Sequence, residues 1–171
     1  LILAILFYRI KTPEIKINIF KKILTVFLGY ILLPLILSIP FYFSIYNLSL
    51  LDSFFETISG FTSTGFTIFS NIRNIDQSLI LWRSSTQWIG GLYFLFSIIF
   101  LIDIYDENFK KTLTNFISFN NSEILKQVTK IFLLYSFLTL SIFLILNFFS
   151  MRVFDSLNLA FTIISSGGFL P

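Results

Sequence analysis

The sequence predicts an all-α integral membrane protein that is built of helix–re-entrant loop–helix repeats. Of its 171 residues, 56% are hydrophobic and only 12% are charged, and the mean hydropathy is +0.86. A soluble domain carries roughly a quarter charged residues, so this chain has too few to cover a solvated surface. Three uncharged runs are long enough to cross a bilayer, and two shorter apolar stretches end in hydroxyl and glycine residues.

Several functions are excluded by what the chain lacks. It has no cysteine and no histidine, which excludes disulfides, thiol nucleophiles, zinc sites of the Cys/His type and histidine acid–base catalysis. We therefore expect no enzyme activity and no cofactor held by this chain. A net charge of +3, without a basic stripe among aromatic residues, does not favour a nucleic-acid partner.

Three apolar runs predict membrane-spanning helices at residues 23–46, 84–102 and 131–151. About 20 helical residues cross a hydrocarbon core of roughly 30 Å. Pro34 and Pro40 lie inside the first run, where a membrane helix that is packed by its neighbours tolerates them as kinks.

Positive charges set the predicted orientation. Nine of the twelve lysines and arginines lie before the first run or between the second and the third, and the other three are Arg73, Arg83 and Arg152. Because positively charged loops stay on the cytoplasmic side, residues 47–82 and 152–171 are expected on the outer side. Arg83, at the head of the second run, is expected to snorkel outward as an interface anchor.

Two short apolar stretches on that outer side predict half-helices that enter the membrane and return as extended chain. Residues 52–61 and 155–164 each begin with an aspartate that we interpret as a helix cap, and ten helical residues span about 15 Å. Ser53 and Glu56 fit a capping box. Glu56 is interpreted either as a helix-start charge or as the partner of an arginine.

These two stretches are predicted to be copies of one repeat. At an offset of 103 residues, Asp52 aligns with Asp155 and Gly65 aligns with Gly168. The apolar runs that precede them repeat at nearly the same offset. The alignment therefore predicts an internal repeat of helix, re-entrant loop and helix.

This repeat divides the chain into four expected parts. They are the end of a preceding helix with a cytoplasmic loop (1–22), a first repeat (23–103), a cytoplasmic linker (104–130) and a second repeat without its closing helix (131–171). Since the chain begins with Leu rather than Met and the second repeat is incomplete, we expect it to be truncated at both ends.

A loop rich in hydroxyl and glycine residues at membrane depth is predicted to line a pore, since irregular backbone there must be buried in protein or face water. Its carbonyl groups replace the hydration shell of a cation, and the negative end of the half-helix favours a cation as well. Glycine allows the backbone conformations that this requires. With neutral oxygens and no fixed carboxylate, such a site suits a monovalent ion better than a divalent one.

The residues in and after the first loop resemble a known family. The segments DSFFETISGFTSTGFTIF (52–69) and LILWRSSTQWIGG (79–91) resemble the first pore loop and second helix of the Trk/Ktr/HKT potassium transporters, above all the bacterial TrkH branch. The segment AFTIISSGGF (160–169) resembles the second pore loop of the same proteins.

The resemblance implies a K⁺ channel-like selectivity filter, of which residues 62–67 form one quarter and residues 165–170 another. The implied filter residues are Thr62, Ser63, Thr64, Gly65, Phe66, Thr67, Ser165, Ser166, Gly167, Gly168, Phe169 and Leu170. K⁺ is implied to bind at Ser63, Thr64, Ser166 and Gly167. Glycine at position 65 favours K⁺, because serine there accompanies Na⁺ transport in the plant relatives.

The resemblance also implies a setting for the protein. Members of the family are multi-pass, pore-forming subunits of the bacterial inner membrane, with four repeats in one chain around a single pore. They are usually homodimers and work with a cytosolic nucleotide-binding regulatory subunit of the TrkA type. K⁺ is then the transported ion.

Two alternatives stay open on the sequence. One is a Na⁺-permeable member of the same family, and the other is a non-transporting membrane assembly subunit. For residues 62–66 the simpler interpretation is a turn that caps a short helix. For Gly90 and Gly91, close helix packing is favoured over an ion site, since small residues let membrane helices approach.

Overall fold

The computed structural model describes residues 19–101 and 124–169, and within them every regular element is a helix. The elements are α2 (Ile19–Leu37), α3 (Ile39–Tyr42), α4 (Leu50–Phe61), the 3₁₀ turn η1 (Ile72–Asn74), α5 (Gln77–Phe100), α7 (Ile124–Phe148) and α8 (Val153–Ser165). The expected helix end at residues 1–8, most of the expected cytoplasmic linker and Leu170 lie outside the described residues.

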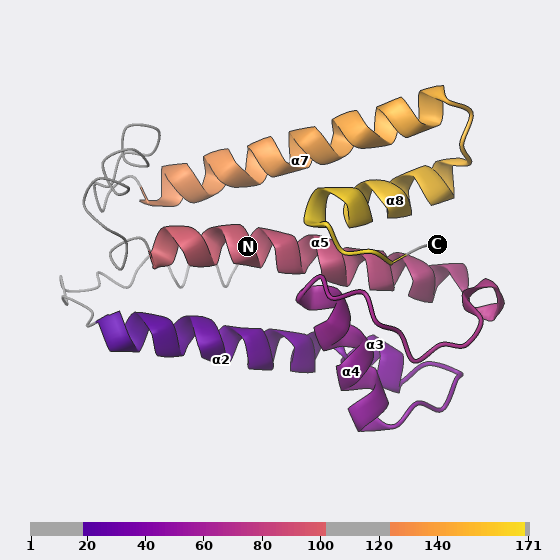
Figure 1. Ribbon diagram of the computed structural model, residues 1–171, viewed down its shortest axis with the longest axis horizontal. Coiled ribbons are helices and arrows are strands. Elements are labelled where there is room, and N and C mark those ends of the chain that lie inside the picture. Colours follow the sequence, from indigo (N-terminus) through magenta and orange to yellow (C-terminus); the bar gives the residue numbers. More distant parts are fainter. Residues whose placement is uncertain (1–18, 102–123, 170–171) are drawn as a thin grey trace, which may run out of the picture.

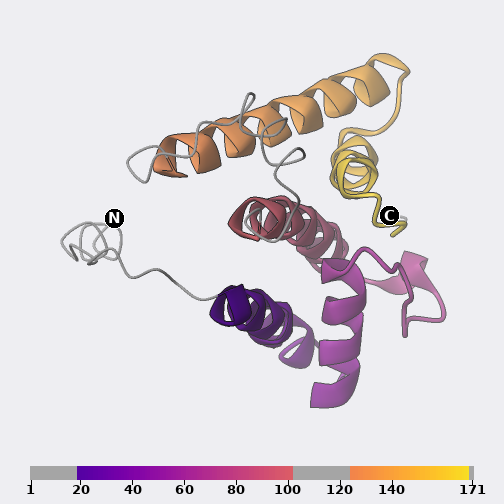
Figure 2. The ribbon, with the colours of Figure 1, turned by 60° about the vertical axis from the view of Figure 1, so that its left-hand side comes forward.

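Three long helices lie side by side, with α5 between α2 and α7 (Figures 1 and 2). The short helix α4 packs against α2 and α5, and the short helix α8 packs against α5 and α7. Both short helices therefore contact α5. This arrangement brings the loops that follow them to the same central helix.

Two of the helices are long and apolar enough to cross a membrane. They are Ile19–Tyr42, which joins α2 and α3 and has a mean hydropathy of 2.3, and Val128–Phe148 of α7, at 2.2. Large apolar side chains such as Phe27 and Leu133 are exposed on these two helices. Such faces suit lipid, and the all-helical fold fits a membrane protein.

The third predicted span, α5, is 24 residues long but does not meet the same hydropathy criterion among the described helices. Its polar residues Arg83, Thr86 and Gln87 are buried against neighbouring helices. Polar groups inside a membrane protein face the interior of the bundle. Because α5 lies between two short helices, it needs less apolar surface than α2 or α7.

The predicted helix boundaries differ from the observed ones. Both α5 and α7 begin seven residues before the expected starts at residues 84 and 131. A search for uncharged runs stops at the first charge, whereas a helix continues through it. In the first span, Pro34 lies inside α2, and Pro40 lies in the first turn of α3, where a missing N–H is tolerated.

The short helices also begin earlier than predicted, and the expected caps are wrong. Ser49 caps α4: its Oγ accepts from Asp52 N at 3.1 Å and donates to Asp52 Oδ2 at 2.7 Å. Asp52 therefore lies in the first turn, and Ser53 is buried instead of forming a capping box. In α8, Asp155 also lies in the first turn, where Arg152 Nε donates to it at 2.7 Å. Both carboxylates lie near the positive ends of their helix dipoles.

Candidate functional site

Helices α4 and α8 end in turns with the same backbone conformation. Ser63 and Ser166 have φ values of 56° and 55°, and Gly65 and Gly168 have φ values of 81° and 77°. Each pair is separated by 103 residues, the offset at which the sequence aligns with itself. A positive φ is uncommon for serine and costs energy, so its recurrence at matched positions marks a shared backbone design.

The hydrogen bonds of the two turns match as well. Thr64 N donates to Ser59 O at 2.9 Å, and Gly167 N donates to Thr162 O at 2.9 Å. Together with the left-handed serine, this bond defines a Schellman motif, which satisfies the last carbonyls of a helix. The two segments thus share the same helix end, position by position.

The glycines of the two turns lie against each other. A β-carbon added to Gly65 would lie 2.8 Å from Gly167 O and 3.7 Å from Gly168 Cα. Only glycine fits at position 65, both because its φ is positive and because the second loop occupies the space. The first and second loops are therefore in direct contact, as a shared site requires.

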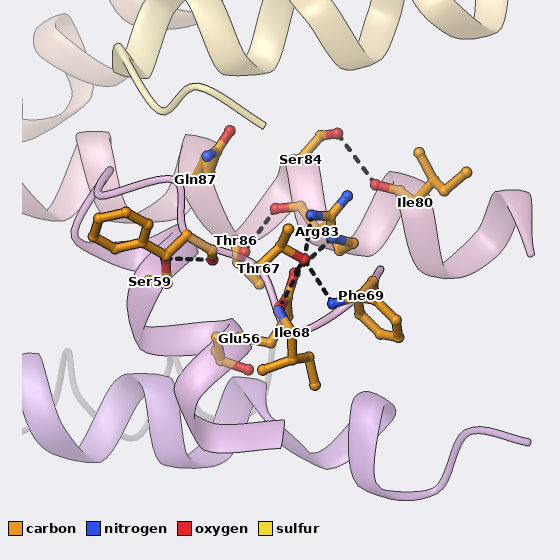
Figure 3. A network of polar contacts seen from close by, with 12 residues as sticks. Glu56, Ser59, Thr67, Ile68, Phe69, Ile80, Arg83, Ser84, Thr86 and Gln87 are labelled. Atoms are coloured by element: carbon orange, nitrogen blue, oxygen red, sulfur yellow. Dashed lines mark hydrogen bonds and ion pairs between the residues drawn. The ribbon is translucent and has the colours of Figure 1, made fainter. Parts of the chain in front are cut away.

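A buried ion pair lies behind the first loop. Arg83 Nε donates to Glu56 Oε1 at 2.7 Å, and neither side chain is more than 1% exposed. Thr67 Oγ1 donates to the same carboxylate at 3.0 Å, and Ile68 N donates to Glu56 Oε2 at 2.9 Å (Figure 3). Glu56 is therefore the partner of an arginine, which confirms one of the two interpretations of this residue.

Arg83 reaches both loops. Its Nη2 donates to Thr67 Oγ1 at 3.1 Å in the first loop, and its guanidinium lies 4.2 Å from the centre of the Phe169 ring in the second. A guanidinium over an aromatic face is attracted by the ring quadrupole. The expectation that Arg83 snorkels outward is wrong, because Glu56 provides an internal partner for its charge.

Several oxygens that were expected to bind an ion have partners inside the protein. Gln87 Nε2 donates to Gly167 O at 2.6 Å, and Ser59 Oγ donates to Phe66 O at 2.6 Å. Among the expected hydroxyl groups, Thr62 Oγ1 donates to Ile58 O at 2.7 Å, and the Ser165 hydroxyl donates to carbonyls of its own helix. These hydroxyl groups donate to carbonyl groups in the last turns of their own helices.

The two phenylalanines of the loops differ in their surroundings. Phe169 is 3% exposed beneath Arg83, whereas Phe66 is 68% exposed. The matched backbone thus carries differently packed side chains.

Close packing explains Gly90 and Gly91. A β-carbon on Gly90 would overlap the backbone of Phe61, and one on Gly91 would lie 2.6 Å from Tyr135 Oη. The interpretation as helix-packing residues is confirmed.

A buried polar stripe on α5 was missed by reasoning from the sequence. Arg83, Thr86, Gln87 and Gly90 are all buried, and they recur at helical spacing on one face. This spacing is the signal that would have indicated a protein-facing side of the helix.

A side-chain hydrogen bond outside the loops links α5 to α8. Ser84 Oγ donates to Asn158 Oδ1 at 2.6 Å.

The fold and the site are those of a helical membrane protein with two matched helix–turn segments packed on one central helix. The chain belongs to the TrkH family, whose profile is described as a cation transport protein and matches residues 2–170. This is a family of transporters rather than enzymes.

Curated relatives agree with this membership. The chain is 29% identical over 151 residues to the uncharacterized cation transporter MJ1485 of Methanocaldococcus jannaschii, covering 82% of this chain and 30% of that protein. It is 28% identical over 139 residues to the Trk system potassium uptake protein TrkH of Escherichia coli K12, covering 77% of this chain and 29% of the relative. It is 42% identical over 60 residues to TrkI of Halomonas elongata, covering 35% and 11%. The chain thus spans less than a third of the length of each relative.

Proposed function

We propose that this chain forms part of the K⁺-translocating pore of a Trk-type uptake system. In this proposal α4 and α8 are half-helices that enter the membrane, and residues 62–67 and 165–170 are two quarters of a selectivity filter. The observation that carries the proposal is the contact between Gly65 and the Gly167–Gly168 backbone, made by two turns of the same conformation.

The electrostatics of the described residues suit a monovalent cation. Glu56 is neutralised by Arg83, so no unpaired carboxylate faces the loops from that side. The carbonyl ends of α4 and α8 carry the negative ends of their helix dipoles, which favour a cation. Within residues 19–101 and 124–169 no cluster of three or more acidic residues offers a divalent site.

The proposed ligands are the backbone oxygens at Ser63, Thr64, Ser166 and Gly167. A carbonyl oxygen has two lone pairs, so Gly167 O retains one acceptor direction beside its bond from Gln87. Within residues 19–101 and 124–169, no hydrogen bond reaches the carbonyl oxygens of Ser63, Thr64 and Ser166. Backbone oxygens replace the water around the ion, as in a K⁺ channel filter.

The proposed setting follows the family. In this proposal the protein lies in the bacterial inner membrane, with its lysine-rich segments on the cytoplasmic side. A TrkA-type regulatory subunit would contact these segments there. Homodimerisation belongs to the same proposal. The names of several curated relatives, such as the Trk system potassium uptake protein of Escherichia coli, support a K⁺ rather than a Na⁺ assignment.

Complementation tests the proposal. The complete reading frame that contains residues 1–171 is expressed in a bacterium that lacks K⁺ uptake, and growth at limiting K⁺ and uptake of radioactive Rb⁺ are measured. We expect both to be restored. Protein that is inserted in the membrane but restores neither would overturn the K⁺ assignment, and uptake of Na⁺ alone would favour the Na⁺-permeable alternative.

A further inference from the structure

We propose that Gln87 is a positioning residue that fixes the Gly167 peptide group and thereby contributes to discrimination between K⁺ and Na⁺. This inference rests on the proposed function. It assigns a role to a side chain of α5 that does not itself belong to either loop.

The contact between these residues joins the two repeats. Gln87 is 0% exposed in the middle of α5, and its Nε2 donates to Gly167 O at 2.6 Å. Figure 3 shows the Gln87 side chain extending from α5 toward the loop that follows α8. A residue of the first repeat thus holds a backbone group of the second.

The orientation of the amide is determined by its partner. A carbonyl oxygen only accepts hydrogen bonds, so the NH₂ group of Gln87 must face Gly167 O. A β-carbon on Gly167 would overlap the Gln87 carboxamide. The glycine therefore makes room for this side chain, and the two residues fit each other.

The second loop needs this support more than the first. It has two consecutive glycines, Gly167 and Gly168, where the first loop has Thr64 and Gly65. Glycine backbones lose the most conformational freedom on ordering, so a Gly–Gly pair rotates readily unless both of its sides are held. Gly167 N donates to Thr162 O in the last turn of α8, and Gln87 holds the carbonyl side.

The first loop is held from within its own repeat instead. Ser59 Oγ donates to Phe66 O at 2.6 Å. Thr162 matches Ser59 in the second repeat, but its buried Oγ1 has no partner in the part of the chain that the structure describes. Ser59 and Gln87 hold carbonyl groups at positions that do not match, because Phe66 aligns with Phe169 and Thr64 aligns with Gly167. The second loop is thus held at a different carbonyl group, and by a side chain from α5.

The position of the held oxygen connects Gln87 to selectivity. Gly167 O lies 2.8 Å from the position that a β-carbon of Gly65 would occupy, so it lies where the two loops meet. Selectivity between K⁺ and Na⁺ depends on the number and placement of the coordinating oxygens. A rotated Gly167 peptide would move one of these oxygens and change the preference between the ions.

Transport by the complete protein tests this role, with Gln87→Met as the main variant. Methionine has a similar length but no donor. The variant loses one hydrogen bond, and the released Gly167 O should then coordinate K⁺ less well while Na⁺ is less affected. We expect the K⁺/Na⁺ ratio of Vmax/KM to fall about fivefold. This ratio compares the two ions on the same protein, so it does not depend on the amount of protein in the membrane.

The matched control is Ser84→Ala. Ser84 lies one turn away on α5, is also buried, and also bonds to the second repeat, through Asn158 of α8. This variant removes a bond from α5 to the helix α8 itself and leaves the loop after α8 untouched, so the K⁺/Na⁺ ratio should stay at the parental value. A ratio that falls equally in both variants would indicate a general packing role for Gln87 and would overturn the inference.

A second variant covers the case in which Gln87→Met does not insert. Gln87→Leu is apolar and has no donor for Gly167 O, so it should lower the ratio as well. Parental ratios in whichever of the two variants inserts would disprove the role of Gln87. A parent protein that shows no K⁺ preference would instead contradict the proposed function, so the two failures are distinguishable.

Discussion

Arg83 Nε and Glu56 Oε1 are 2.7 Å apart in a site that solvent does not reach. The pair joins α5 to α4, and through Thr67 and Phe169 the same guanidinium contacts both loops. An ion pair in such a place is costly to break, because removal of one partner leaves the other charge buried. The ion pair therefore lies behind the two matched turns and contacts both of the loops that contain them.

Replacement of Arg83 by methionine is therefore expected to destabilise the protein by about 3–5 kcal/mol, because Glu56 is left as a buried, uncompensated carboxylate. The double variant Arg83→Met/Glu56→Gln should recover much of this loss, since no buried charge remains. Thermal unfolding of the detergent-solubilised complete protein measures both.

An exposed ion pair in the same chain is the control. Arg152 and Asp155 are also 2.7 Å apart, but the Arg152 side chain is 85% exposed. Exposed pairs contribute little, so Arg152→Met should leave the midpoint of unfolding nearly unchanged. Equal effects of Arg83→Met and Arg152→Met would show that burial is not what makes the first pair important.

The sequence predicted the elements of this fold better than their contacts. Apolar runs indicated α2, α5 and α7, and the internal alignment indicated that α4 and α8 end alike. These features depend on local composition and on periodicity, which one sequence contains. Helix starts were less well predicted, because Ser49 rather than an aspartate caps α4.

The contacts behind the loops were not predictable in the same way. Arg83 was assigned to the interface because it precedes an apolar run, and Gln87 received no role. Whether a polar side chain finds a buried partner depends on which helices pack against it. That information comes from tertiary structure, although the helical spacing of the α5 polar residues indicated a protein-facing side.

Gly65→Ala should abolish or strongly reduce transport. An L-residue at a φ of 81° is strained by about 1–2 kcal/mol, and the new β-carbon would also press on Gly167 O, 2.8 Å away. Gly65→Ser should lower the K⁺ preference over Na⁺ in any protein that still transports. Uptake of Rb⁺ with Na⁺ as competitor measures both effects.

The matched variant Gly168→Ala separates strain from contact. Gly168 has a similar φ of 77°, but a β-carbon there would meet nothing within 4 Å among the described residues. It should therefore show only the conformational cost and a milder loss of transport. If Gly168→Ala were as damaging as Gly65→Ala, contact between the loops would not explain the requirement for glycine at position 65.

Ser59 and Thr162 occupy matched positions but should respond oppositely to loss of their hydroxyl groups. Ser59→Ala removes the bond to Phe66 O and should cost about 1 kcal/mol. Thr162→Val keeps the shape of a side chain whose buried Oγ1 has no partner within the described residues, so it should be neutral or stabilising. Thermal unfolding of the two single variants, compared with the parent, measures the difference. A destabilised Thr162→Val would show that this hydroxyl has a partner in the complete protein, and an unchanged Ser59→Ala would show that the first loop does not depend on its internal bond.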